Sequence, residues 1–313
     1  MKIAYADHGP DATWHKDHPM GTLVFQYLLT GEANSPDNFM FLLARQEADF
    51  TMQRHRHNFD QIRLPLHGDM NIGERLMLKE GHVGYFPEGL PYGPQIDPLG
   101  RSKPGERLQL VLQFGGASGL GFMSMDQRKE AWAELAKTGK FAGPVYHRPD
   151  GRKQWGLNAV WELVFKERLK YPMPRYDHVI IADPGRYNWL NVPGARATAS
   201  RYLGAFSERR VWIEMLRLEK SASWTSVDHS ARRLFYALSG SGSVNGQDIQ
   251  KGAAIQIDAD ERAEFACNDA QTEGLNLYLI GLPPVPTPVA PETFEIDDGM
   301  VPEGVLKANH AHP

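Results

Sequence analysis

The sequence is poor in cysteine, since Cys267 is the only one among 313 residues. A single thiol excludes a disulfide framework within the chain and is typical of a reducing compartment. Long apolar runs are missing as well, because none approaches the roughly 18 residues of a membrane-spanning helix. Residues 1–21 also lack the apolar core of a signal peptide. We therefore expect a soluble, cytoplasmic protein with no membrane partner.

An excess of positive charge is missing too. The chain carries 34 lysines and arginines against 38 aspartates and glutamates, a net charge of −4. This balance provides no basic surface for nucleic acid, so nucleic acid is not expected as a partner. What the chain does have is length and apolar residues, 42% of the total, which suffice for a large core and suggest about two domains.

Two regions of the chain are rich in residues that favour strands. The first runs from "NFMFLLARQ" (38–46) to "RLQLVLQFGG" (107–116), and the second from "RRVWIEMLRLEKSASW" (209–224) to "GLNLYLIGL" (274–282). Glycine, asparagine and aspartate divide both into short runs, as at "VNGQ" (244–247). Several short strands at this spacing predict a sandwich or a barrel.

The stretch between these regions shows helical patterns instead. Residues 124–141 have apolar residues at helical spacing, and Asp126 is a candidate N-cap. In residues 154–171 an apolar stripe runs from Leu157 to Val164 and ends in basic residues, as a helix C-terminus prefers. The sequence therefore predicts two helices between the β regions.

Both β regions repeat one spacing. In the first and second region respectively it reads His55-x-His57-x3-Gln61-x6-Gly68 and Val227-x-His229-x3-Arg233-x6-Gly240. Downstream, thirteen positions separate Gly68 from Gly81 in the first region, and twelve separate Gly240 from Gly252 in the second. Lengths that repeat while residues change indicate two copies of one structural unit.

This spacing resembles the cupin superfamily, whose first motif is G-x5-H-x-H-x3-E-x6-G and whose second is G-x5-P-x-G-x2-H-x3-N. The matching positions in the first region are His55, His57, Gly68, Gly81, Pro87 and Gly89. The resemblance covers both β regions and implies a mainly β bicupin, in which a short helical linker joins two tandem double-stranded β-helix barrels. It implies an N-terminal cupin barrel over 1–118, a helical linker over 119–180, a C-terminal barrel over 181–284 and a proline-rich tail over 285–313.

The resemblance also implies a metal site formed by the two histidines and the glutamate of the first motif and the histidine of the second. His55 and His57 match, but Gln61 stands at the glutamate, Tyr92 at the last histidine, and Asp49 at the opening glycine. In the second region only His229 matches a ligand. The other ligand positions there hold Val227, Arg233 and Ala263, so the resemblance implies a degenerate C-terminal barrel without metal.

Strand geometry places His55 and His57 on one side, because residues two apart point to the same face. Two converging imidazoles can chelate a divalent transition metal, with iron as the first choice and manganese, nickel, copper and zinc as alternatives. Gln61 can add a carbonyl oxygen. Tyr92 can act as a phenolate ligand, a hydrogen-bond donor or a general acid/base. Gln95 is a further candidate for contacting the substrate. The alternative is a vestigial site whose histidines are only hydrogen-bonded.

Arg63 lies two residues beyond Gln61 and shares its face. An unpaired buried guanidinium is costly, so it must find a partner. A carboxylate of a small anionic substrate would fit as a bidentate partner, while an internal salt bridge with Asp60 or Glu88 is the alternative. "HRHNFDQIR" also resembles the first motif of gentisate-type ring-cleaving dioxygenases, which lack the glutamate and carry an arginine at this offset. Those enzymes keep a third histidine that this chain lacks.

The function expected first is that of a metal-dependent oxygenase acting in the N-terminal barrel on a small carboxylated compound, with aromatic ones as candidates. His55, His57 and Gln61 would hold the metal, and Arg63, Tyr92 and Gln95 would contact the substrate. A lyase or isomerase acting through an enediolate is the second expectation, and a bicupin that binds a small molecule without turning it over is the third. The second barrel would serve as a scaffold or as a homodimer interface.

Overall fold

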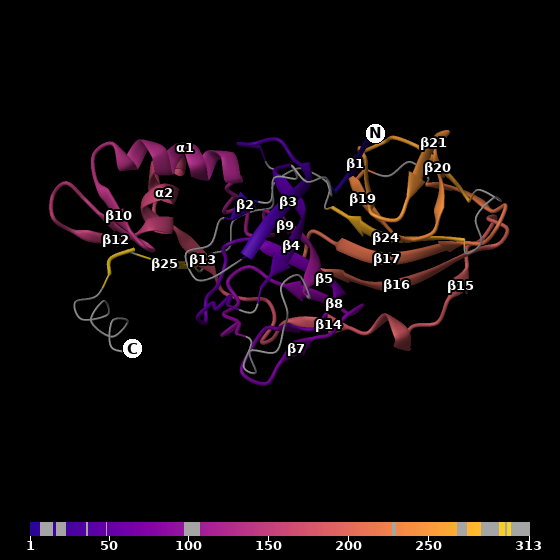
Figure 1. Cartoon of the computed structure of the whole chain (residues 1–313), viewed down its shortest axis with the longest axis horizontal. Coiled ribbons are helices and arrows are strands. Elements are labelled where there is room, and N and C mark those ends of the chain that lie inside the picture. The colour runs from indigo at the N-terminus through magenta and orange to yellow at the C-terminus, as the bar shows by residue number, and fades with distance from the viewer. Residues whose placement is uncertain are drawn as a thin grey trace.

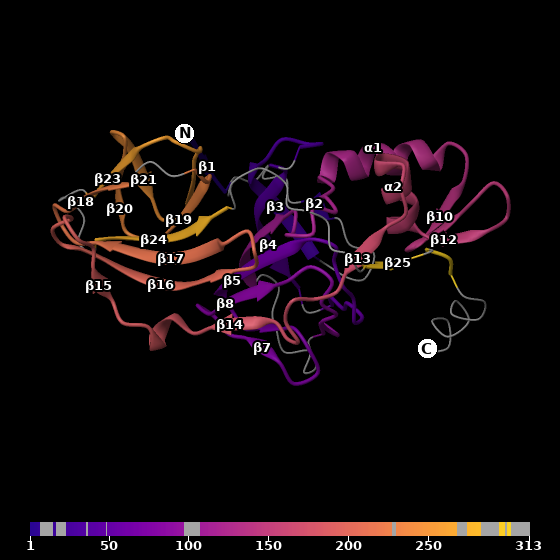
Figure 2. The ribbon, with the colours of Figure 1, turned by 180° about the vertical axis from the view of Figure 1, so that it is seen from behind.

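The structure is a computed structural model that describes residues 1–6, 15–16, 23–35, 37–47, 49–96, 107–226, 230–267, 274–282, 294–297 and 299–301. Antiparallel strands dominate it, and the described residues contain only two α-helices. Figures 1 and 2 show three parts in a row: a linker module that holds both helices, a first barrel and a second barrel. The mainly β fold predicted from the sequence is confirmed. Within the described ranges, neither helix is long and apolar enough to span a membrane.

The first barrel is built on a seven-stranded antiparallel sheet. In order across the sheet, its strands are β14 (Ile180–Ala182), β8 (Val83–Phe86), β5 (Asp60–His67), β9 (Leu108–Phe114), β4 (Phe39–Gln46), β3 (Leu23–Thr30) and β2 (His15–Lys16). The other side of the barrel carries a two-stranded sheet of β6 (Met70–Asn71) and β7 (Met77–Leu78), together with isolated bridges such as His55 to Tyr92.

The second barrel repeats this plan. Its seven strands, in order, are β1 (Lys2–Tyr5), β22 (Ala253–Ile257), β19 (Arg233–Ser239), β24 (Leu275–Gly281), β17 (Val211–Leu218), β16 (Thr198–Phe206) and β15 (Leu190–Asn191). A four-stranded sheet covers it, with β18 (Ser223–Ser226), β23 (Ala263–Cys267), β20 (Ser241–Val244) and β21 (Gln247–Gln250). One 3-10 turn, Pro184–Arg186, precedes β15.

The register repeats as closely as the strand order. The pairing of β3 with β4 shifts after Tyr27, and the pairing of β16 with β17 shifts after Tyr202. The pairing of β5 with β9 shifts after Pro65, and that of β19 with β24 after Ala237. Two matching bulges fix which residues of the two barrels are equivalent.

The edge strands cross between the two halves of the chain. Lys2–Tyr5, at the N-terminus, pairs with β22 of the second barrel, while Ile180–Ala182, which follows the linker, pairs with β8 of the first. Each sheet is therefore completed by a strand that is distant from it in sequence, which ties the barrels together. The domain limits expected from the sequence stay a prediction.

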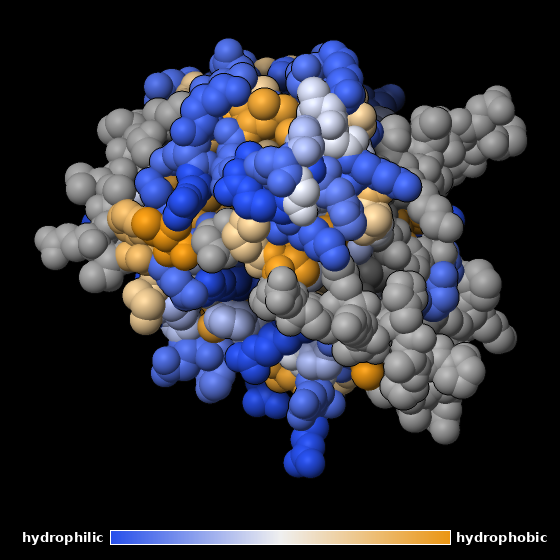
Figure 3. All heavy atoms as spheres, turned by 90° about the vertical axis from the view of Figure 1, so that its left-hand side faces the viewer, coloured by the Kyte–Doolittle hydropathy of each residue, from blue (hydrophilic) through white to orange (hydrophobic). Residues whose placement is uncertain are grey.

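The linker module contains α1 (Met125–Ala136), α2 (Gly156–Phe165) and a sheet of β10 (Lys140–Ala142), β11 (Val145–His147) and β12 (Lys153–Trp155). The N-cap of α1 is Ser124, which forms a capping box with Gln127, so the cap expected at Asp126 was wrong. In α2 Trp161 is buried as expected, but Leu157 at the start of the predicted stripe is 42% exposed. Figure 3, which faces this module, shows a mostly hydrophilic surface with separate hydrophobic patches.

Part of the C-terminal tail joins the same module. Phe294–Ile296 forms β25, which pairs with β13 (Lys170–Pro172), and Gly299 accepts a backbone hydrogen bond from Trp155 at 2.7 Å. Most of the tail expected over 285–313 lies outside the described residues.

The two seven-stranded sheets pack face to face through a shared apolar core. Ile62 and Leu64 of β5 contribute to it from the first barrel, and Ile213 and Tyr278 from the second. Because side chains alternate along a strand, Gln61, Arg63 and their cross-strand neighbours point the other way, into the first barrel. The packing between the barrels thus decides which side chains of β5 line the interior.

Candidate functional site in the first barrel

Three segments of the first barrel bring most of the predicted residues together. Gln61 and Arg63 come from β5, and His55 and His57 come from the segment just before it. Tyr92 follows β8 and lies opposite His55, because the two residues exchange backbone hydrogen bonds of 2.9 and 3.0 Å. The motif spacing therefore corresponds to one side-chain cluster in space.

Hydrogen bonds in this cluster converge on the hydroxyl of Tyr92. Arg63 Nη2 donates to it at 2.7 Å, and Gln61 Nε2 donates at 3.4 Å. Both bonds use the oxygen as an acceptor, so we assign the tyrosine's own proton to the contact with His57 Nε2, 3.0 Å away. This assignment places the hydrogen of a neutral His57 on Nδ1.

The guanidinium of Arg63 is held in a fixed orientation. Its Nε and Nη2 both donate to Gln61 Oε1, at 3.0 and 2.7 Å, and its Cζ lies 4.5 Å from the ring centre of Phe86. Arg63 is only 8% exposed and Gln61 is fully buried. Phe86 was not predicted to belong to the site. It lies in the site because it pairs with Gln61 across β5 and β8, and a single sequence does not reveal that register.

His55 forms the more open side of the cluster. Its ring centre lies 4.9 Å from that of His57, at 84°, and 4.5 Å from that of Tyr92. Its Nδ1 is 2.9 Å from the carbonyl oxygen of Gln53. Both histidines are half-buried, so the cluster reaches the protein surface on their side.

Burial controls the protonation of the two central groups. It lowers the pKa of His57 well below its usual value, and the nearby His55 and the charge of Arg63 lower it further. Burial raises the pKa of Tyr92, although Arg63 and Gln61 oppose this effect. At neutral pH the cluster therefore combines a neutral imidazole, a neutral phenol and a positive guanidinium.

Arg63 has no carboxylate partner among the described residues. The alternative, a salt bridge with Asp60 or Glu88, was wrong: Glu88 binds Arg175 Nη1 at 2.6 Å, and Asp60 accepts hydrogen bonds from Tyr85 Oη and the Glu88 backbone. Within the described part of the chain, Nη1 of Arg63 donates to no protein atom, and it is not fully buried. A buried positive charge without a counter-ion marks the place where an anion would be stabilised.

Two glutamines on the same interior face are also unsatisfied. Gln109 pairs in register with Pro65, two residues from Arg63, and Gln46 lies at the end of β4. Gln109 Oε1 and Gln46 Nε2 are both buried, with no hydrogen-bond partner among the described residues. A buried amide group left without a partner costs about 1–3 kcal/mol, so this interior favours a polar occupant.

The remaining substrate candidate does not join the cluster. Gln95 is buried, its side chain donates weakly to the Asn71 carbonyl at 3.5 Å, and its backbone pairs with Met52. Among the described contacts, none links Gln95 to Arg63 or Tyr92.

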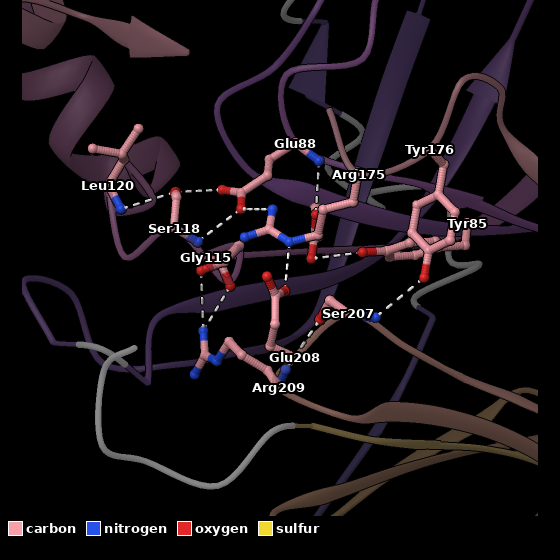
Figure 4. Close-up of polar contacts among 12 residues, drawn as sticks. Tyr85, Glu88, Gly115, Ser118, Leu120, Arg175, Tyr176, Ser207, Glu208 and Arg209 are labelled. Atoms are coloured by element: carbon pink, nitrogen blue, oxygen red, sulfur yellow. Dashed lines mark hydrogen bonds and ion pairs between the residues drawn. The ribbon is translucent and has the colours of Figure 1, made fainter. Parts of the chain in front are cut away.

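A second polar cluster, shown in Figure 4, lies at the junction of the two barrels. Glu88 accepts hydrogen bonds from Ser118 and Arg175, and Arg175 also pairs with Glu208 in the hairpin between β16 and β17. Burial, followed by the negative charge of Glu88, raises the pKa of Asp60 to about 7. The sequence offered no signal for this cluster, because its members come from segments that are 30 to 87 residues apart.

The donor atoms of the first cluster do not fit the divalent metal that the cupin motif implies. Both lone pairs of Gln61 Oε1 accept hydrogen bonds from Arg63, and the Nε2 lone pair of His57 accepts the proton of Tyr92. The described residues also contain no group of three or more histidine, cysteine, aspartate or glutamate side chains arranged to hold a metal.

The second barrel has a different arrangement at the equivalent place. Val227 and His229 lie outside the described residues. Arg233 takes the position of Gln61, and its guanidinium donates to Ser226 Oγ and to the carbonyl oxygen of Glu261. Ala263, at the remaining ligand position of the motif, is fully buried. The expected absence of metal from this barrel remains a prediction.

A cavity of about 290 Å³ lies elsewhere, in the linker module between the helices and β11–β12. Its lining residues are Leu135, Thr138, Tyr146, Arg148, Pro149, Gln154, Ala159, Glu162 and Leu163. None of the residues predicted for the site lines it.

Comparison with solved structures identifies the fold. The chain aligns with a protein from Nostoc punctiforme (11% identity, TM-score 0.55, 95% of this chain and 83% of that one) and with YlbA from E. coli (10%, 0.53, 89% of each). It also aligns with quercetin 2,3-dioxygenase from Acinetobacter baumannii (10%, 0.51, 99% of this chain and 94% of that one). The chain has the cupin fold. Identities this low show the fold alone, and no family model and no curated protein sequence matches the chain.

Proposed function

We propose that the first barrel of this cupin-fold chain binds a small carboxylated anion through Arg63, and that His57 and Tyr92 exchange a proton with the bound molecule. The observation that carries the proposal is the buried guanidinium with no carboxylate partner among the described residues. Gln61 and Tyr92 orient it but are neutral, so they leave its charge uncompensated. An anion at Nη1 would supply that compensation.

The geometry restricts how the anion binds. Nε and Nη2 of Arg63 are already used by Gln61 and Tyr92, so the bidentate fork expected from the sequence would require Gln61 to move away. Without that movement a carboxylate binds end-on to Nη1. The unsatisfied amides of Gln46 and Gln109 favour a ligand with further polar groups.

Proton transfer is the chemistry that the neighbouring residues support. A neutral His57 can accept a proton, and Tyr92 can donate one, with Arg63 stabilising negative charge that develops on the ligand. This combination suits a lyase or isomerase step next to a carboxylate. The metal-dependent oxygenase, the first expectation from the sequence, stays a prediction. Oxygen uptake with Fe²⁺ and a panel of small carboxylates would test it, and lack of dependence on His55 and His57 would contradict it.

Binding is tested by calorimetric titration of small mono- and dicarboxylates into the wild type and Arg63→Met. Loss of a charge-assisted hydrogen bond should weaken binding by roughly 10- to 100-fold. Arg217→Met is a matched control, because Arg217 is a half-buried arginine of the second barrel that stacks on Trp189 at 4.7 Å. Equal affinity in the wild type and Arg63→Met would overturn the proposal.

Catalysis is tested separately by following deuterium incorporation from D₂O into the carbon next to the carboxylate of each bound compound. The wild type should accelerate exchange, and Tyr92→Phe should slow it by roughly 100-fold while leaving binding within about threefold. Binding without any exchange would identify the protein as a binding protein, which was the third expectation from the sequence.

A further inference from the structure

We infer that the Arg63 guanidinium is the resident cation of the first barrel and takes the place of a divalent metal among the four side chains that the cupin motif places there. This inference does not rest on the identity of any ligand, because it concerns only how the protein's own side chains are used. It would hold equally if no carboxylate bound at Nη1.

The position of one nitrogen is the central observation. Nη2 of Arg63 lies 2.7 Å from Gln61 Oε1 and 2.7 Å from Tyr92 Oη, so it bridges the two oxygens predicted as metal donors. The next predicted donor, His57 Nε2, contacts the same tyrosine oxygen at 3.0 Å. A cation bound by these atoms would have to displace the guanidinium.

Displacement is opposed on both sides of the guanidinium. One side carries three hydrogen bonds to Gln61 and Tyr92, and the ring of Phe86 covers its Cζ at 4.5 Å. A guanidinium keeps its charge at any pH the protein tolerates. A second cation beside it would therefore meet repulsion in a poorly hydrated interior.

The two departures from the motif agree with this exchange of cations. An amide in place of a carboxylate, and a phenol in place of an imidazole, both remove strong donors for a divalent metal. Both also provide neutral oxygens that accept N–H hydrogen bonds, which is what a guanidinium requires. A centre that had only lost its metal would not need a buried arginine at its middle.

The test is metal binding, measured without reference to activity. Wild-type protein is treated with chelator, desalted, and titrated anaerobically with Fe²⁺, Mn²⁺, Ni²⁺ and Zn²⁺, with metal content measured by mass spectrometry. We expect well below one equivalent. The triple variant Gln61→Glu, Arg63→Met, Tyr92→His should bind about one equivalent, at least about a hundredfold more tightly than the wild type. Adding His55→Ala and His57→Ala to the triple variant should abolish that binding.

Single substitutions keep the inference testable if the triple variant does not fold. Arg63→Met should bind Zn²⁺ at least about tenfold more tightly than the wild type, whereas Arg63→Lys, which keeps the charge, should continue to exclude it. The inference is overturned if wild-type protein holds near-stoichiometric metal that is lost in His55→Ala/His57→Ala. It is equally overturned if a folded Arg63→Met variant binds metal no better than the wild type.

Discussion

The two barrels share strand order and bulges, yet their interiors differ at equivalent positions. The matching registers make Arg63 equivalent to Phe235 and Gln109 equivalent to Leu277. Phe235 and Leu277 are fully buried in an apolar cluster, whereas the first interior places a charge and an unpaired amide at these positions, beside apolar clusters of its own. One fold thus serves once as a packed scaffold and once as a polar centre, and side chains at equivalent positions decide which.

The arginines of the two barrels show the same contrast. Arg233, at the position equivalent to Gln61, sends its guanidinium to a serine hydroxyl and to backbone carbonyls, and so holds β19 to neighbouring segments. Arg63 sends its guanidinium only to Gln61 and Tyr92 within the described residues. A buried arginine therefore indicates a ligand site only where its partners are side chains of a polar cluster.

The largest effect is expected when the charge of the first interior is placed in the second. Phe235 packs with its ring centre 4.7 Å from that of Phe265, inside an apolar cluster of the described residues. Phe235→Arg should lower the free energy of unfolding by about 4 kcal/mol, because it buries an unpaired charge. Urea denaturation measures this. Arg63→Met removes a charge that has no counter-ion but leaves Gln61 Oε1 without a donor, so it should lower the free energy of unfolding by less, about 1–2 kcal/mol. Equal losses in both variants would remove the contrast between the interiors.

An intermediate effect concerns the junction of the barrels. The folded state holds a proton on Asp60 up to about pH 7, whereas the unfolded chain releases it near pH 4. Between these values the folded state binds more protons than the unfolded state, so stability should fall as pH rises, by up to about 1.4 kcal/mol per unit. In Asp60→Asn the amide oxygen can still accept from the Glu88 backbone while the amide N–H donates to Tyr85 Oη, and the loss of the titrating carboxyl should remove this dependence. Unfolding curves from pH 4.5 to 8 test it, and an unchanged slope in the variant would contradict it.

The smallest effect is expected from removing the amide of Gln109. Gln109→Leu removes a buried acceptor without a partner and should stabilise the ligand-free protein by about 1 kcal/mol. The mirror change, Leu277→Gln, should destabilise the second barrel by about 3 kcal/mol. Thermal denaturation compares the two, and a loss of stability in Gln109→Leu would indicate that Gln109 already has a partner.

Much of the first cluster could be predicted from the sequence. The spacing of His55, His57 and Gln61 predicts that they share one face of adjoining segments, and the interval to Tyr92 matches the motif. In the structure these four side chains contact one another. Which hydrogen bonds these side chains form could not be predicted. Whether Arg63 binds Gln61 or Asp60 depends on the side-chain rotamers, and both residues lie close to Arg63 in the sequence.

Contacts between distant segments could not be predicted from the sequence for a different reason. Lys2–Tyr5 has too little pattern to reveal that it completes the second barrel, and Glu88 finds Arg175 only after both barrels and the linker are placed. The N-cap of α1 was also predicted wrongly, because Ser124 and Asp126 are both favourable N-cap residues and lie only two residues apart.

The most direct test of the central claim is nitrogen NMR of arginine Nε–H groups in the wild type, with Arg63 assigned from the signal missing in Arg63→Met. The account predicts a slowly exchanging Arg63 signal, protected by its bond to Gln61, that shifts on addition of a small carboxylate while the Arg217 signal does not. An Arg63 signal that exchanges as fast as a surface arginine and ignores every carboxylate would contradict it.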